Sequence, residues 1–181
     1  MTQHSDAPEL VEVPRRPVSA EAFKDAFRRQ PGGVAVITAD AGEGPAALTV
    51  TSVASVSAEP PLVVFSVSEL SSAGPTILGA ESVVIHLIDV DALGVAKLAA
   101  THGVDRFGDP ATWVRLPTGE PLYLGVRNWL RCRIVDRVVA GGSTLVVGMV
   151  LETGHPDDEL TPPVVYHNRT WHALGEHSEI G

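Results

Sequence analysis

Hydroxyl side chains are concentrated in one stretch of the chain, residues 47 to 72. In an extended strand alternate side chains share a face, and four hydroxyls alternate in the first half of this stretch: Thr49, Thr51, Ser55 and Ser57. Hydroxyls and neighbouring backbone N–H groups suit a ligand with carbonyls, ring nitrogens and a phosphate, because each hydroxyl donates and accepts without bringing charge. The solvated face of an antiparallel strand shows the same alternation, so the pattern leaves both interpretations open.

A second group of hydroxyls follows at residues 66 to 72, S-V-S-E-L-S-S, before a helix expected to begin near Pro75. The free N–H groups of a helix start, together with serine hydroxyls, can cradle an anion without a glycine-rich loop. Glu69 would repel a phosphate there unless its side chain points away. The alternative is a solvated loop.

These segments resemble the flavin reductase-like family of FMN-binding split barrels. That family carries a segment like G-M-T-V-N-S-F-T-S-V-S-x-x-P-P-L, then a strand and a serine-rich turn; residues 47–62 read A-L-T-V-T-S-V-A-S-V-S-A-E-P-P-L, in the same register and without a gap. The resemblance extends over about residues 23 to 174. It implies a mainly β fold: an antiparallel, Greek-key split β-barrel with a few short helices.

The resemblance also implies a flavin site. In that family the phosphate and ribityl chain of FMN lie at the serine turn, and the hydroxyl strand meets the isoalloxazine ring. The implied flavin contacts are Thr51, Ser52, Ser66, Val67, Ser68, Ser71 and Ser72. The sequence Asp105-Arg106-Phe107 matches a D-R/K-F loop, in which Arg106 pairs with an anionic ligand group and Phe107 covers the flavin ring, from the same or the neighbouring subunit. Bridging of Arg106 to Asp105 or Asp109 is an equally good interpretation.

The C-terminal run V-V-Y-H-N-R-T-W, residues 164–171, resembles the family's L-L-Y/F-x-R-G-x-Y element near the nicotinamide pocket. It implies that His167 is the catalytic residue that acts on NAD(P)H and that Arg169 orients the nucleotide. Pro45 and Ala46 match the other side of that pocket. A surface-strand histidine is the alternative for His167. The spacing of His167 and His172, without a nearby acid or cysteine, does not predict a metal, and we expect none.

Two positions depart from the family pattern. Relatives often have Asp-His where this chain has Gly142-Ser143, and a strand asparagine where it has His86. Both departures would affect the use of pyridine nucleotide without removing flavin. His86 stands alone in an apolar strand, so we expect a hydrogen-bonded core residue.

Composition agrees with a single β-rich domain. The chain has 181 residues with 44% hydrophobic but only 5% aromatic, so β-branched aliphatic residues must build the core. A net charge of −9, with one short basic patch at residues 127–137, excludes a nucleic-acid groove. The single Cys132 allows no intrachain disulfide, and no signal peptide or long apolar run is present. We therefore expect a cytoplasmic protein without a membrane partner.

Local patterns predict the elements that would position these residues. Residues 1–17 are expected to be a flexible arm, residues 18–176 the reductase-like domain and residues 177–181 a tail. Three helices are expected: one capped by Ser19 with an apolar stripe, one near Pro75, and one capped by Asp91. The expected strands are a hairpin from residue 34, two strands joined at Pro60-Pro61, and an interior strand at 82–88. A second hairpin at 126–152 and a strand at 164–166, before a tight turn at 168–170, complete the chain.

Together these features predict a homodimeric NAD(P)H-dependent flavin reductase. It would transfer hydride from NADH or NADPH to FMN, with FAD as the other flavin, and would supply reduced flavin to a partner monooxygenase. Two alternatives stay open: a flavin-carrying protein without reductase turnover, and an oxidoreductase that acts on another small molecule with bound FMN.

Overall fold

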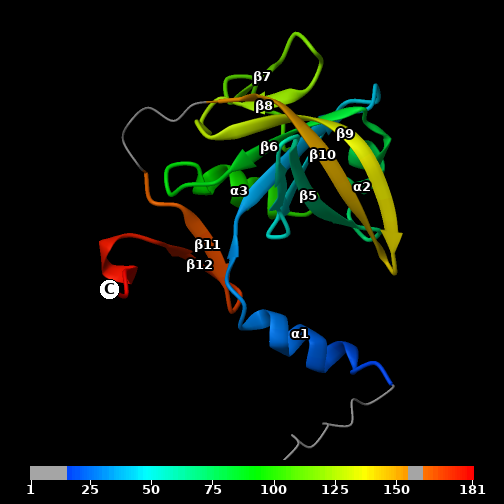
Figure 1. Cartoon of the computed structure of the whole chain (residues 1–181). Coiled ribbons are helices and arrows are strands. Elements are labelled where there is room, and N and C mark those ends of the chain that lie inside the picture. Colours follow the sequence, from blue (N-terminus) through cyan, green and yellow to red (C-terminus); the bar gives the residue numbers. More distant parts are fainter. Residues whose placement is uncertain (1–15, 155–160) are drawn as a thin grey trace, which may run out of the picture.

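The computed structural model of the protein describes residues 16–154 and 161–181 (Figure 1). The arm expected at residues 1–17 therefore lies largely outside the described residues. The helices are α1 (Ala20–Arg28), α2 (Gly74–Gly79), α3 (Leu93–Ala100) and the 3-10 helix η1 (Glu176–Ser178). The strands are β1 (Gly32–Gly33), β2 (Ala35–Asp40), β3 (Pro45–Val50), β4 (Ala54–Ala58), β5 (Pro61–Ser68), β6 (Ser82–Leu87), β7 (Trp113–Arg115), β8 (Pro121–Tyr123), β9 (Trp129–Ala140), β10 (Ser143–Thr153), β11 (Val164–His167) and β12 (Thr170–Ala173).

Seven antiparallel strands form the central sheet in the order β3-β2-β6-β9-β10-β5-β4. β3 and β4 are consecutive in the chain, with only residues 51–53 between them, yet they are the two edges of this sheet. An extended residue spans at most about 3.6 Å, so three residues can join the two edges only if the edges come together. The sheet is therefore rolled into a barrel that stays open between β3 and β4.

This topology corrects the expectation that the first half of the hydroxyl stretch is one strand. The chain leaves one edge after Val50 and begins the other edge at Ala54. Thr49 is thus on β3 while Ser55 and Ser57 are on β4, so the four hydroxyls do not share one face. The crossing at Ser52 is held by a hydrogen bond that the Ser66 N–H donates to Ser52 Oγ, 3.0 Å.

Most expected elements are present. Ser19 caps α1 by accepting a hydrogen bond from the Ala22 N–H, and β6 lies in the interior between β2 and β9. The expected cap of α3 was wrong: the Ala92 N–H donates to Asp89 Oδ1, and Asp91 instead pairs with Arg127. The short strands β1, β7 and β8 were not predicted, because two or three residues carry no readable alternation.

Two groups of buried side chains fill the molecule. The first lies in the barrel, where Ile37, Phe65 and Ile85 are fully buried with α2 residue Ile77. The second lies between the sheet, α3 and the small sheet β1-β11-β12, and includes the fully buried Tyr123. The edge strand β3 contributes to both groups, with Val50 in the first and Ala47 in the second.

Helix α1 lies away from the barrel (Figure 1). None of its residues is buried, and its two phenylalanines, Phe23 and Phe27, contact one another with ring centroids 4.7 Å apart. Its last turn is joined to the turn between β11 and β12 by a hydrogen bond from the Asn168 N–H to the carbonyl of Arg28, 3.0 Å. In the part of the chain that the structure describes, no helix is long and apolar enough to cross a membrane.

Candidate functional site

A cavity of about 390 Å³ opens at the beginning of β3. It brings together five of the residues singled out from the sequence: Pro45, Ala46, Ser72, Arg106 and Phe107. They come from β3, the serine turn and the loop after α3, so three segments far apart in the sequence meet here. We call this cavity the Arg106 pocket.

Arg106 supplies the positive charge of the pocket. One terminal N–H of its guanidinium donates to the carbonyl of Thr101, 3.0 Å, while its Nε is buried and has no partner among the described residues. Asp105 and Asp109 do not pair with it. Asp105 instead accepts a hydrogen bond from the Phe107 N–H, and Asp109 accepts one from the Ala111 N–H. The bridging interpretation of Arg106 is therefore wrong. A buried N–H of a cation without an acceptor favours an anionic ligand at this place.

Phe107 forms part of the pocket wall. Its ring stacks on Tyr123 with centroids 5.2 Å apart and planes 10° apart, and it meets the edge of Trp113 at 5.0 Å. The Trp113 indole N–H also donates to the Phe107 carbonyl, 3.0 Å. One ring face is thus already covered from within this chain. Whether the other surface covers a flavin stays a prediction.

A buried histidine and a buried tyrosine hold the loop that carries Arg106. The Tyr123 N–H donates to His86 Nε2, 3.1 Å, so His86 Nδ1 carries the proton and donates to the Val36 carbonyl, 3.0 Å. The Tyr123 hydroxyl in turn donates to the Arg106 carbonyl, 2.8 Å. The expectation that His86 is a hydrogen-bonded core residue is confirmed. Burial lowers the pKa of His86 to about 4, so it is neutral near pH 7, and burial raises the pKa of Tyr123 to about 12.

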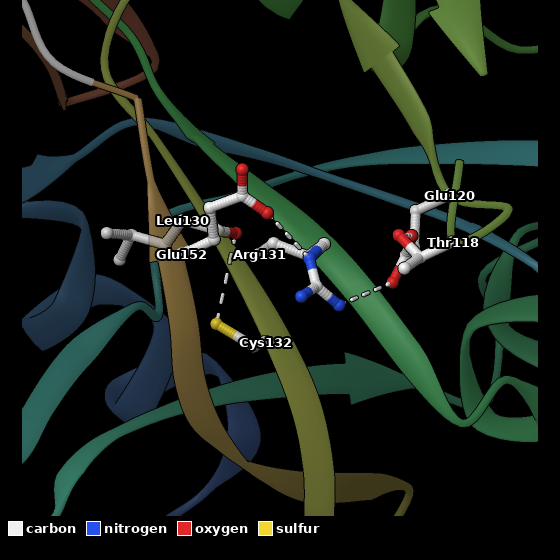
Figure 2. Close-up of polar contacts among 6 residues, drawn as sticks. All are labelled: Thr118, Glu120, Leu130, Arg131, Cys132 and Glu152. Atoms are coloured by element: carbon white, nitrogen blue, oxygen red, sulfur yellow. Dashed lines mark hydrogen bonds and ion pairs between the residues drawn. The ribbon is translucent and has the colours of Figure 1, made fainter. Parts of the chain in front are cut away.

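Ion pairs fix the hairpin that carries Tyr123 (Figure 2). Arg131 of β9 lies between Glu120, which precedes β8, and Glu152 of β10, at 3.5 and 3.1 Å. Burial would raise the pKa of Glu120, but hydrogen bonds from Ser82 and Thr118 and the Arg131 charge together lower it. Glu120 is therefore ionised at neutral pH. Removing Arg131 would leave a buried carboxylate unpaired and would loosen β8.

The serine turn contributes less to the pocket than the sequence suggested. Among its residues only Ser72 lines the Arg106 pocket. The Val67 side chain is fully buried in the barrel core, so only its backbone is left for a ligand. Ser68 Oγ accepts a hydrogen bond from the Leu70 N–H, and the Ser68 carbonyl accepts one from Ser71. These bonds shape the turn itself.

A second hollow region lies at the other end of β3. Two adjoining cavities, of about 240 and 280 Å³, share Thr51 and Tyr166. The Tyr166 ring meets Trp171 of β12 edge-on at 4.9 Å. Thr49 lines one cavity, but its hydroxyl donates to the Ala96 carbonyl, 2.7 Å, and so ties β3 to α3. We call this region the Thr51 groove.

The predicted nicotinamide residues are divided between the two regions. Arg169 lines the Thr51 groove, whereas Pro45 and Ala46 line the Arg106 pocket, at the other end of β3. His167 is half-buried on β11, with its ring 5.8 Å from that of His172, and lines neither region. The structure thus does not bring these four residues into one pocket.

Sequence reasoning missed two kinds of residue at these regions. Lys24 and Arg28 of α1 line the Thr51 groove, and their i, i+4 spacing on one helix face was a readable signal. Tyr123 gave no signal, because its role depends on contacts with His86 and Arg106, which are 37 and 17 residues away along the chain.

Comparisons with known proteins point to one family. Residues 27–175 match the family model described as flavin reductase like domain. An NADH:FMN oxidoreductase of Rhodococcus erythropolis is 38% identical over 166 residues, covering 90% of this chain and 86% of the relative. The reductase component of a 4-hydroxyphenylacetate 3-monooxygenase from Thermus thermophilus is 33% identical over 154 residues, covering 85% and 96%.

A solved structure gives the same result. The crystal structure of a flavin reductase domain protein from an Arthrobacter species superposes with a TM-score of 0.78 at 32% identity, covering 86% of this chain and 95% of the other. The mainly β architecture expected from the sequence is confirmed by this likeness.

Proposed function

Because the chain belongs to the flavin reductase-like family, we propose that it takes hydride from NADH and passes it to FMN held at the Arg106 pocket. It is a flavin reductase, and FMN supplies the hydride-accepting ring of the reaction. The observation that supports FMN here is the buried, unpartnered Nε of Arg106 in a pocket lined by Ser72 and Thr76, a cation with hydroxyls beside it. Glu43 and Asp105 also line the pocket, so the residues present fit a phosphorylated flavin whose phosphate lies at Arg106 and away from these carboxylates.

Arg106 binds the phosphate in this proposal, and Ser72 and Thr76 donate to it. Phe107, held by Tyr123, forms an apolar wall. Pro45 and Ala46 belong with these residues, on the flavin side. Among the other predicted flavin contacts, Thr51 lines the groove at the other end of β3 and Ser52 lies in the crossing between β3 and β4. Ser66 and Ser68 are on β5 and Ser71 follows it, and the contacts of all five residues with flavin stay part of the proposal.

The protein's contribution to hydride transfer is to hold two rings together, because the transfer itself needs no side-chain acid. We place the nicotinamide nucleotide in the Thr51 groove, where Thr51 and Tyr166 offer a hydroxyl each. Mixing the purified protein with free FMN and NADH tests the function: NADH consumption must exceed that of FMN and NADH alone. A flavin carrier, or an enzyme that reduces another molecule, would leave it at that background.

His167 is proposed to act on the nicotinamide side, because it belongs to the C-terminal run that resembles the family's nucleotide-proximal element. Replacing His167 with alanine should raise the KM for NADH or lower the rate of flavin reduction about tenfold, the loss expected for one hydrogen bond to a substrate, while FMN affinity stays nearly constant. Stopped-flow reduction at several NADH concentrations, run beside an FMN titration, checks this. A variant that loses FMN but is reduced at the normal rate when saturated would overturn the assignment.

We also propose a homodimer, supported by apolar side chains left exposed on the β9–β10 hairpin. Val138 and its β10 partner Leu145 share one face of the hairpin and are 47% and 39% exposed, and Val139 on the other face is 75% exposed. A second copy of the chain would cover such apolar side chains. Light scattering should give a dimer at micromolar concentration, and replacing Val138 and Val139 with aspartate should give a folded monomer. A monomeric wild type, or a variant that stays dimeric, would contradict this interface.

We also propose a partner protein and a cellular location for the enzyme. A partner monooxygenase that consumes the reduced flavin is supported by the Thermus relative, which is named as a reductase component. A reducing cytoplasm is supported by the single, buried cysteine.

A further inference from the structure

Three cations surround one end of the Thr51 groove. Lys24 and Arg28 of α1 and Arg169 of the β11–β12 turn line the cavity of about 240 Å³, together with Thr51 and Tyr166. Among the described residues only Asp25 pairs with any of them, at 3.2 Å from Arg28 and on the exposed helix surface. This concentration of positive charge stands out in a chain whose net charge is −9.

The position of α1 is not explained by packing. None of its residues is buried, but its last turn is fixed to the β11–β12 turn by the hydrogen bond from the Asn168 N–H to the Arg28 carbonyl. Lys24 and Arg28 are four residues apart, so they share the helix face that meets this turn. The contact thus brings two helix cations next to a third one.

Arg169 occupies a backbone conformation that normally belongs to glycine. Its φ is +62°, after Asn168 at +47°, which is a two-residue hairpin turn whose second position strongly favours glycine. An arginine here costs stability, and strain of this kind is retained where the side chain serves a function. Arg169 lines the cavity, so an anion bound between the three cationic residues would account for this strained position.

We propose that Lys24, Arg28 and Arg169 bind the diphosphate of the pyridine dinucleotide, which makes α1 part of the NADH site. The inference rests on the proposed reductase function. The shared residues Thr51 and Tyr166 connect this subsite with the rest of the groove, where the nicotinamide end lies. A phosphoryl group is the chemistry that three cations and a hydroxyl recognise, and guanidinium groups bind it in a bidentate manner.

The test compares NADH with 1-benzyl-1,4-dihydronicotinamide, a hydride donor without phosphates. Each of Lys24→Gln, Arg28→Gln and Arg169→Gly should lower kcat/KM for NADH about tenfold relative to that for the neutral donor. Arg133→Gln, which removes an exposed charge from β9, is the matched control and should keep the wild-type ratio. Arg169→Gly should melt at the same or a higher temperature, because glycine relieves the turn.

Each result of this experiment either supports the diphosphate subsite or contradicts it. The subsite is contradicted if the ratio of kcat/KM for NADH to kcat/KM for the neutral donor is unchanged in all three variants. It is also contradicted if this ratio changes as much in Arg133→Gln. If the variants instead lose their preference for FMN over riboflavin and keep the donor ratio, the bound phosphate is that of FMN and the proposal is overturned. Failure of the reductase function looks different, because the wild type would then accelerate FMN reduction by neither donor above the rate without protein.

Discussion

Replacing Arg106 with methionine should weaken FMN binding about 10- to 100-fold while the protein stays folded. A charge-assisted hydrogen bond to a phosphate contributes roughly 1.5–3 kcal/mol. Among the described residues the Arg106 side chain makes a single hydrogen bond, to the Thr101 carbonyl, that the substitution removes. Methionine keeps the length of the aliphatic part, so the pocket wall changes little. Fluorescence titration with FMN measures the effect.

Riboflavin provides the internal control for this prediction. It lacks the phosphate, so its affinity should change far less than that of FMN in Arg106→Met. Arg106→Lys should recover part of the FMN affinity, because it restores the charge but not the Nε donor. Equal losses for FMN and riboflavin would show that Arg106 only shapes the pocket, and would remove the phosphate from this place.

Stability should fall as the pH is lowered from about 6.5 to about 4, because of His86. The unfolded chain protonates this side chain near its ordinary pKa of 6.5, whereas the folded protein, in which burial lowers the pKa to about 4, binds the proton only at lower pH. The unfolded state thus binds more protons in this window, so acid favours unfolding. The difference between 6.5 and 4 corresponds to roughly 3 kcal/mol, with little further loss from this group below pH 4.

Denaturant unfolding at several pH values tests the role of His86. His86→Asn cannot titrate but can still donate to the Val36 carbonyl, so its stability should depend less on pH between 6.5 and 4. His86→Leu removes both side-chain hydrogen bonds, leaves the Tyr123 N–H without the partner that His86 supplies, and should lose about 2–5 kcal/mol at pH 7. It should also weaken FMN binding, because Tyr123 then no longer fixes Arg106. A wild type and a His86→Asn variant with the same pH dependence would contradict this account.

Local patterns predicted much of the fold because the signals were local. Ser19 as a helix cap, the Pro60-Pro61 turn between β4 and β5, and the tight turn before Thr170 all depend on a few neighbouring residues, and the structure confirms them. The division of the hydroxyl stretch between β3 and β4 was not predictable in this way. The alternation of hydroxyls is interrupted only at Val53, and the closure of the barrel is what separates the two strands.

The site was predicted in its residue types more than in its arrangement. The D-R/K-F match singled out Arg106, but its lack of an acid partner depends on how the loop folds. Val67 follows the serine pattern, yet strand pleating turns its side chain into the core. Pro45 and Arg169 were placed at one pocket, although the length of β3 separates them. Such distances depend on tertiary structure, which a motif does not contain.

Anaerobic mixing of the FMN-loaded protein with NADH tests the central claim most directly. We expect one equivalent of NADH to bleach the visible absorption band of oxidised flavin, faster than NADH bleaches free FMN, and deuterium at the transferred position of NADH to slow the bleaching. A bleaching rate no higher than that of free FMN, or a flavin spectrum that NADH leaves unchanged, would contradict the assignment of this chain as a flavin reductase.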